Sequence, residues 1–116
     1  MGKRYEVSWE GHFSLNKLYE GGHWTRRNGL KQKWKATYMA LIAEAKIPKI
    51  ARYTLEIRYN SRLDPSNVTG MLKVFEDTLT EMGVIPDDSK KFCRGIGIVP
   101  DESLKSGSYV AVITVC

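Results

Sequence analysis

The sequence predicts an α/β (α+β) fold, in which a single mixed β-sheet packs against two helices with the elements in the order β-α-β-α-β-β. Two observations carry this prediction. Four short segments are rich in alternating or continuous apolar residues, as strands are, and two longer segments repeat their apolar residues at helical spacing. The chain has 116 residues, the length of one domain, and we expect residues 1–116 to form a single domain.

The first half of the chain begins with a strand. Apolar and polar residues alternate over residues 5–9, and Gly11 ends this strand. Residues 14–29 are rich in Gly, Asn and basic groups, which predicts a long loop. A helix is expected over about residues 30–45, because Pro48 lies just beyond it and four apolar residues recur at helical spacing. These four are Trp34, Tyr38, Leu41 and Ile42.

A second strand and a second helix follow. Residues 53–60 alternate between apolar and polar, which predicts a half-buried strand. Asp64 can cap the helix after it, with Pro65 at the first helical position and Gly83 as its stop. The apolar residues of this helix form one stripe: Val68, Met71, Leu72, Phe75, Leu79 and Met82. A turn over residues 84–89 and strands over residues 92–99 and 109–115 complete the prediction.

Charge is distributed unevenly along the chain. The net charge is +5, and the first 35 residues hold eight basic residues against three acidic ones, whereas the remainder balances. A concentrated basic segment predicts a polyanionic partner such as a nucleic acid. The alternative is a basic surface that only keeps the protein in solution.

Several classes of protein are excluded by composition. No segment approaches the roughly 20 apolar residues that span a bilayer, and the N-terminus has no apolar signal region, so we expect no membrane association. Cys93 and Cys116 are too few for a disulfide scaffold, which predicts reduced thiols and a cytoplasmic protein.

The residues that could carry chemistry gather around the second predicted helix. Lys73 and Asp77 lie one turn apart on the side opposite the apolar stripe, with Gly70 beside them in angle, so we expect this side to face solvent. Other polar candidates flank the helix, two at its start and two after its end: Asp64, Ser66, Asp87 and Asp88.

Taken singly, each candidate has an ordinary explanation. Asp64 suits a helix cap, Lys73 and Asp77 suit a surface ion pair, and the two adjacent aspartates suit a turn. Together, these residues suggest a Mg²⁺ site that could hydrolyse a phosphodiester. Mg²⁺ is usually held by one or two carboxylates with waters and substrate phosphates, and phosphodiester hydrolysis needs an activated water and a stabilised leaving oxygen. A lysine beside the carboxylates could neutralise charge on the phosphate.

These residues resemble the RusA family of Holliday-junction resolvases. The similar elements are the run Arg62-Leu63-Asp64-Pro65-Ser66-Asn67, then Lys73 and Asp77, then Gly83-Val84-Ile85-Pro86-Asp87-Asp88-Ser89. The family has an Asp-x-Asp-Asn element, a downstream Lys, an Asp one turn later and a Gly-hydrophobic-Asp-Asp-Ser element. Residues 14–19, Ser-Leu-Asn-Lys-Leu-Tyr, also resemble the family's N-terminal Ser-x-Asn-x-x-Tyr segment.

The resemblance implies a homodimeric, Mg²⁺-dependent endonuclease that cuts four-way DNA junctions in phage or prophage recombination and repair. It implies catalytic roles for Asp64, Lys73 and Asp88, and metal binding by Asp64 and Asp88. Asp77 and Asp87 would support the metal, and Asn67 would hold the start of the helix. From charge and position we expect DNA contacts from six residues: Asn16, Lys17, Arg26, Arg27, Lys31 and Lys33.

One position departs from the family pattern. Ser66 stands where the second Asp of Asp-x-Asp-Asn is expected, and its hydroxyl can ligate a metal but carries no charge. Asp64 and Lys73 are also nine residues apart, about one helical turn more than in the shortest family versions. The alternative function is therefore a branched-DNA-binding protein with impaired or no catalysis. A third reading is a small domain whose acids are only caps and turns. Trp9 on the first strand suits either the core or a dimer interface.

Overall fold

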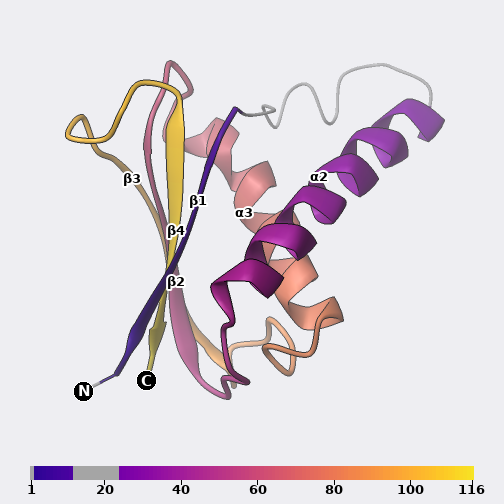
Figure 1. Cartoon of the computed structure of the whole chain (residues 1–116), viewed down its shortest axis with the longest axis vertical. Coiled ribbons are helices and arrows are strands. Elements are labelled where there is room, and N and C mark those ends of the chain that lie inside the picture. The colour runs from indigo at the N-terminus through magenta and orange to yellow at the C-terminus, as the bar shows by residue number, and fades with distance from the viewer. Residues whose placement is uncertain (1, 12–23) are drawn as a thin grey trace.

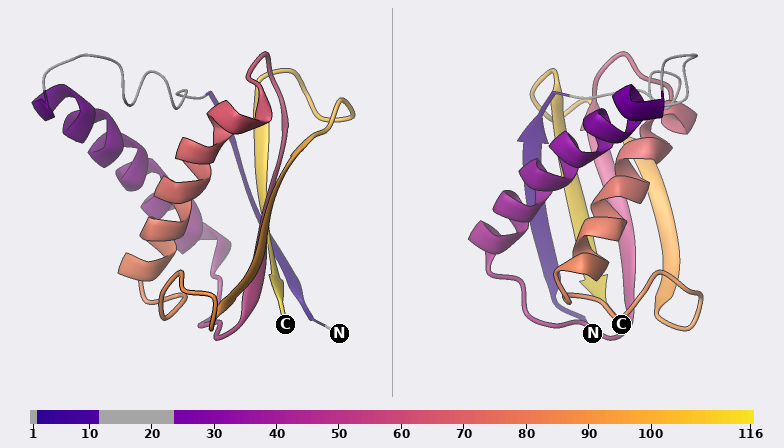
Figure 2. Two further views of the ribbon diagram at one scale, coloured as in Figure 1. Left: turned by 180° about the vertical axis from the view of Figure 1, so that it is seen from behind. Right: turned by 90° about the vertical axis from the view of Figure 1, so that its right-hand side faces the viewer.

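Four strands form one mixed sheet in the order β1-β4-β2-β3, and both helices lie on the same face of it (Figures 1 and 2). The computed structural model describes residues 2–11 and 24–116. The strands are β1 (Arg4–Glu10), β2 (Tyr53–Asn60), β3 (Cys93–Pro100) and β4 (Ser108–Val115). The helices are α2 (Trp24–Ala45) and α3 (Pro65–Glu81). The predicted fold class and the predicted order of the elements are confirmed.

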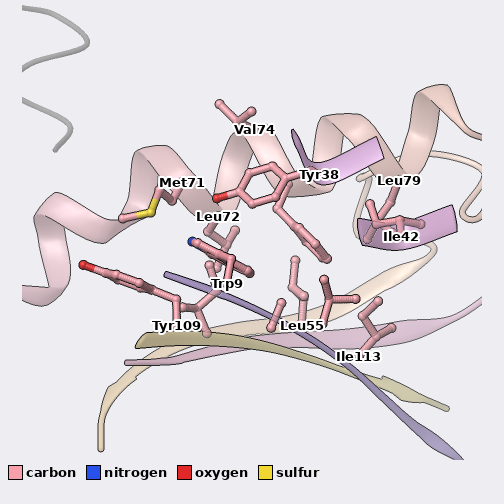
Figure 3. Packing of buried hydrophobic residues seen from close by; sticks show 14 of the residues in the cluster. Trp9, Tyr38, Ile42, Leu55, Met71, Leu72, Val74, Leu79, Tyr109 and Ile113 are labelled. Atoms are coloured by element: carbon pink, nitrogen blue, oxygen red, sulfur yellow. The ribbon is translucent and has the colours of Figure 1, made fainter. Parts of the chain in front are cut away.

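The sheet combines two kinds of strand pairing. β4 runs antiparallel to both β1 and β2, whereas β3 runs parallel to β2 and is reached through α3. Apolar residues at alternate positions point toward the helices, as the pleat of a strand requires. Trp9 is 7% exposed and packs edge-on against Tyr38 of α2, with ring centroids 4.8 Å apart (Figure 3). In this chain Trp9 therefore belongs to the core.

α3 follows its sequence signals closely. Pro65 occupies the start of the helix, and five of the six predicted stripe residues are buried, with Met82 partly buried. Gly83 adopts a positive φ of 73°, the backbone conformation that glycine tolerates best after a helix. The N–H of Val84 then donates to the carbonyl oxygen of Leu79 at 3.0 Å. These features anchor the start of the turn that precedes β3.

The predicted start of the first helix was wrong. α2 begins at Trp24, so residues 24–29 are helical rather than part of the predicted loop, while residues 14–23 lie outside the described part of the chain. Asn28 and Gly29 have low helix propensity, and this lowered the expectation there. Each such residue costs only about 1 kcal/mol or less, so a helix stabilised elsewhere by packing can contain them.

One face of α3 also differs from the prediction. Gly70, which lies next to Asp77 in angle, is buried rather than exposed. The helical wheel was judged against a single sheet, but α2 packs against α3 as well. Figure 2 shows the two helices side by side on the sheet. The side of α3 that carries the candidate residues therefore lies beside α2 and is only partly open to solvent.

Candidate functional site

Lys73 of α3 lies at the centre of the candidate site. Its ammonium donates a hydrogen bond to Oδ2 of Asp88 and lies 3.5 Å from Oδ1 of Asp77. The side chain of Lys73 is 57% exposed, so the group is accessible from solvent. The structure thus brings together three of the predicted residues, one cation and two carboxylates.

Local geometry explains why these three meet. Lys73 and Asp77 are separated by one turn of the same helix, which places their side chains next to each other. Asp88 comes from the turn after α3. That turn is held by buried Val84 and Ile85, and the N–H of Ile50 donates to the carbonyl oxygen of Val84 at 2.7 Å. The first half of this turn is therefore part of the core, and this fixes the backbone that places Asp88 next to Lys73.

Lys73 and Asp88 stabilise each other's charged forms. The hydrogen bond from Lys73 and the positive charge of that lysine hold the pKa of Asp88 below its usual range. The hydrogen bond to Asp88, with further contributions from Asp77, Asp88 and Glu76, raises the pKa of Lys73. Both groups are therefore charged at neutral pH, and the site presents a fixed ammonium between carboxylates.

α2 supplies a second lysine to the same cluster. Nζ of Lys31 lies 3.8 Å from Oδ2 of Asp77, so Asp77 lies between two lysines from two helices. One turn further along α2, Lys35 pairs with Glu81 of α3. Lys33 is exposed on the same helix. This arrangement places one basic side chain of the predicted DNA-binding set, that of Lys31, directly beside the carboxylates.

Four of the six predicted DNA contacts lie where the structure describes no side chains. Asn16 and Lys17 lie outside the described residues. Arg26 and Arg27 belong to the start of α2, but their side chains are likewise not described. Of the six predicted DNA contacts, Lys31 and Lys33 are the two whose side chains the structure describes.

Asp64 occupies the start of α3 without acting as a side-chain cap. It has extended backbone angles (φ −74°, ψ 153°), and its carboxylate makes no capping hydrogen bond. The N–H of Asn67, which an N-cap side chain often engages, donates instead to the backbone carbonyl of Asp64 at 2.9 Å. The prediction that Asp64 takes the cap position is confirmed, and the capping hydrogen bond is absent. Its carboxylate is left available for another role.

The predicted residues fall into two groups along α3. Asp64 and exposed Ser66 lie at its start, whereas Lys73 lies nine residues beyond Asp64, about 13 Å further along a helix axis. Asp87 belongs to neither group. Its carboxylate turns to its own loop and accepts the N–H of Ser89 at 2.7 Å. Hydrogen bonds from the side chain and backbone of Ser89 lower the pKa of Asp87.

The donor set suits a hard cation in part. Among residues 2–11 and 24–116, no three His, Cys, Asp or Glu side chains gather closely enough to hold a metal ion. Asp77 and Asp88 nevertheless converge on one point, which the Lys73 ammonium occupies. Mg²⁺ commonly uses only one or two carboxylates and completes its shell with water and substrate phosphates. These two residues therefore fit the protein share of such a site.

Sequence reasoning missed a buried polar pair beside this cluster. Glu76 is 5% exposed, and the hydroxyl of Tyr53 donates to its Oε2 at 2.6 Å. Glu76 sits at the margin of the apolar stripe, next to Leu72 in angle, which was the available signal. Burial, followed by the hydrogen bond to Glu76, raises the pKa of Tyr53. The pair ties α3 to β2 directly below the helix turn that carries Lys73.

Comparisons with known proteins add no assignment. Neither the models of known protein families nor the curated proteins match this chain. In the described part of the chain, neither helix is long and apolar enough to cross a membrane.

Proposed function

We propose that this protein is a Mg²⁺-dependent, structure-selective endodeoxyribonuclease that resolves four-way DNA junctions in the cytoplasm of a bacterial or phage-infected cell. The RusA-like order of its motifs supports the proposal. The observation that carries it is the exposed Lys73 ammonium between Asp77 and Asp88, with Lys31 beside them. A surface that offers both carboxylates for a cation and lysines for a phosphate has the composition that phosphodiester hydrolysis requires.

Each residue has a role in this proposal. Asp88 and Asp77 would hold Mg²⁺, whereas Asp64, about 13 Å from Lys73 along the helix axis, is too far away to share their ion. When bound, the ion supplies an activated water and neutralises charge on the leaving oxygen. Lys73 would neutralise charge on the scissile phosphate, and Lys31 would bind a neighbouring phosphate. A symmetric homodimer would place two such sites on opposite strands of a two-fold junction.

A second function is favoured by one specific observation. Ser66 is exposed and uncharged, and the described residues hold no group of three acids. A protein with the same basic surface but too few carboxylates would bind branched DNA without cutting it. This alternative shares its DNA partner with the first proposal and differs only in the chemical step.

A cleavage assay separates the two functions. The protein is incubated with a synthetic four-way junction and Mg²⁺, beside Asp88→Asn and a matched control, Asp101→Asn. Asp101 is also an ion-paired carboxylate of low pKa, but its partners are Arg58 and Ser103, away from Lys73. We expect paired nicks from the wild-type protein and from Asp101→Asn, and none from Asp88→Asn.

The remaining outcomes are equally decisive. Tight junction binding without nicks in Mg²⁺ or Mn²⁺ would establish the binding function instead. Absence of both binding and nicks would reject both functions. If phosphate contacts dominate, the affinity for the junction should fall steeply as salt rises, and a flat salt dependence would contradict the role given to the lysines.

A further inference from the structure

Residues 89–94, which we call the basic turn, lie directly beside the carboxylate cluster. They carry three exposed basic side chains: Lys90, Lys91 and Arg94. None of the three forms an ion pair with a carboxylate in the described part of the chain, whereas Lys31, Lys35 and Lys73 each do. The positive charge of the basic turn is therefore not neutralised by ion pairs within residues 2–11 and 24–116.

Local contacts fix the shape of the basic turn. The carbonyl oxygen of Ser89 accepts the N–H of Phe92 at 3.0 Å. Nη1 of Arg94 donates to the carbonyl oxygen of Lys90 at 2.8 Å. Nζ of Lys91 lies 5.4 Å from the centroid of the Phe92 ring, a distance at which the ring attracts a cation. The two lysines are therefore presented by an ordered backbone.

The basic turn continues a line of contacts that begins on α2. Nζ of Lys31 lies 3.8 Å from Asp77, and the Lys73 ammonium lies between Asp77 and Asp88. Lys90 follows Asp88 by two residues, so their Cα atoms are at most about 7 Å apart. Basic groups thus lie at both ends of the carboxylate cluster, with Lys31 at one end and the basic turn at the other.

The loop that packs against the basic turn has the same sign of charge. Residues 46–52 contain no acidic residue and three exposed basic ones: Lys46, Lys49 and Arg52. The N–H of Tyr53, which follows this loop, donates to the carbonyl oxygen of Phe92 at 2.9 Å. Figure 1 shows the loop before β2 and the loop before β3 at the same end of the molecule. The positive surface therefore extends from the basic turn onto a second segment.

We propose that the basic turn binds the phosphate backbone of DNA next to the phosphate held at Lys73, so that the strand is bound at both ends of the carboxylate cluster. The proposal rests on the DNA partner that both proposed functions share. A DNA strand carries one phosphate per about 3.4 Å of helix axis, so a strand that reaches Asp88 presents further phosphates to a turn only a few residues away. Contacts to phosphates position the DNA and carry no sequence information, so the basic turn should add affinity without base preference.

The first test measures how junction binding depends on salt, by fluorescence anisotropy without a divalent metal. Lys90→Gln and Lys91→Gln are compared with Lys105→Gln, which removes the same charge. Lys105 is 78% exposed and precedes β4, which runs antiparallel to β2, whereas the basic turn leads into β3, which runs parallel to β2. The control therefore lies at the opposite end of the sheet.

Each test variant should lose one phosphate contact. The slope of log affinity against log salt should then become shallower by about 0.9, so the fall in affinity between about 50 and 200 mM salt should be about 3.5-fold smaller. Lys105→Gln should keep the wild-type slope, and Lys91→Arg, which keeps the charge, should keep it as well.

The second test asks whether the contact is direct. A junction is made with neutral methylphosphonate linkages in place of the phosphates beside the crossover. We expect the wild-type protein to bind this junction more weakly than the unmodified one. Lys90→Gln and Lys91→Gln should bind it no more weakly than the wild-type protein does, because the phosphates that their lysines would contact are already neutral.

Failure of the inference differs from failure of the proposed function. Wild-type salt slopes in both test variants overturn the inference, while cleavage by the wild-type protein would leave the nuclease proposal standing. Equal changes of slope in the test variants and in Lys105→Gln also overturn it, because only net charge would then matter. If the wild-type protein binds the junction without cutting it, the nuclease proposal fails and the slopes still decide the role of the basic turn. If the wild-type protein binds no DNA, the inference falls together with both functions.

Discussion

Replacing Lys73 with glutamine should separate the chemistry of the site from the stability of the fold. Glutamine keeps much of the length of the side chain and removes its charge. Because Lys73 is 57% exposed, water screens its pairs with Asp77 and Asp88, and losing them should cost less than about 1 kcal/mol of unfolding free energy. The apolar stripe of α3 is untouched, so the fold should remain.

The effect on cleavage should be much larger. A group that stabilises developing charge in the transition state is worth about 100- to 1000-fold in rate, so Lys73→Gln should lose cleavage by that factor. Single-turnover cleavage of the junction measures this, and thermal unfolding measures stability. Lys105→Gln is the matched control, because Lys105 also forms an exposed ion pair, with Glu10 at 3.1 Å. Cleavage at the wild-type rate by Lys73→Gln, or equal losses in both variants, would refute the reasoning.

Three further predictions concern other parts of the molecule. Ser66→Asp should raise Mg²⁺-dependent cleavage, because an exposed position can accept a carboxylate without repacking, and a flat or lower rate would contradict the account of Ser66. Tyr53→Phe should cost about 1–3 kcal/mol in urea unfolding by leaving the buried Glu76 carboxyl without its donor, and adding Glu76→Leu should recover part of that loss. Burial raises the pKa of the Tyr38 and Tyr53 phenols, so the folded protein retains protons that the unfolded chain releases near pH 10. The free energy of unfolding should therefore keep its full value below pH 10 and fall above it by about 1.4 kcal/mol per pH unit for each tyrosine. The phenolate absorbance of these two tyrosines should appear only when the protein unfolds.

The fold could be predicted from the sequence where local patterns and packing agree. Alternation over residues 53–60 predicted β2 because that strand has one face on the core, and every apolar residue in it is buried. Pro65 and Gly83 marked the ends of α3 through their backbone chemistry. The start of α2 was predicted six residues late, because Gly29 and Asn28 disfavour a helix locally and nothing in the local pattern reports what stabilises it.

The site could be predicted as a set of residues but not as an arrangement. The spacing of Lys73 and Asp77 on one helix is local, so their contact followed from the sequence. The contact of Lys73 with Asp88 depends on how the turn after α3 folds back, and the contact of Asp77 with Lys31 depends on how α2 crosses α3. The buried Glu76 was missed because its partner, Tyr53, comes from another strand. Contacts between distant elements are set by tertiary packing and leave little trace in periodicity.

The charge balance of the site bears on how a metal would enter it. Two lysines, Lys31 and Lys73, face two carboxylates, Asp77 and Asp88, so these four charges already cancel. A divalent cation that binds Asp88 must compete with the Lys73 ammonium for the same oxygen, and no carboxylate at position 66 adds to the attraction. Lys73→Gln should therefore bind Mn²⁺ more tightly than the wild-type protein even as it loses cleavage. Weaker Mn²⁺ binding by that variant would mean that the lysine organises the two carboxylates for the metal rather than competing with it for them.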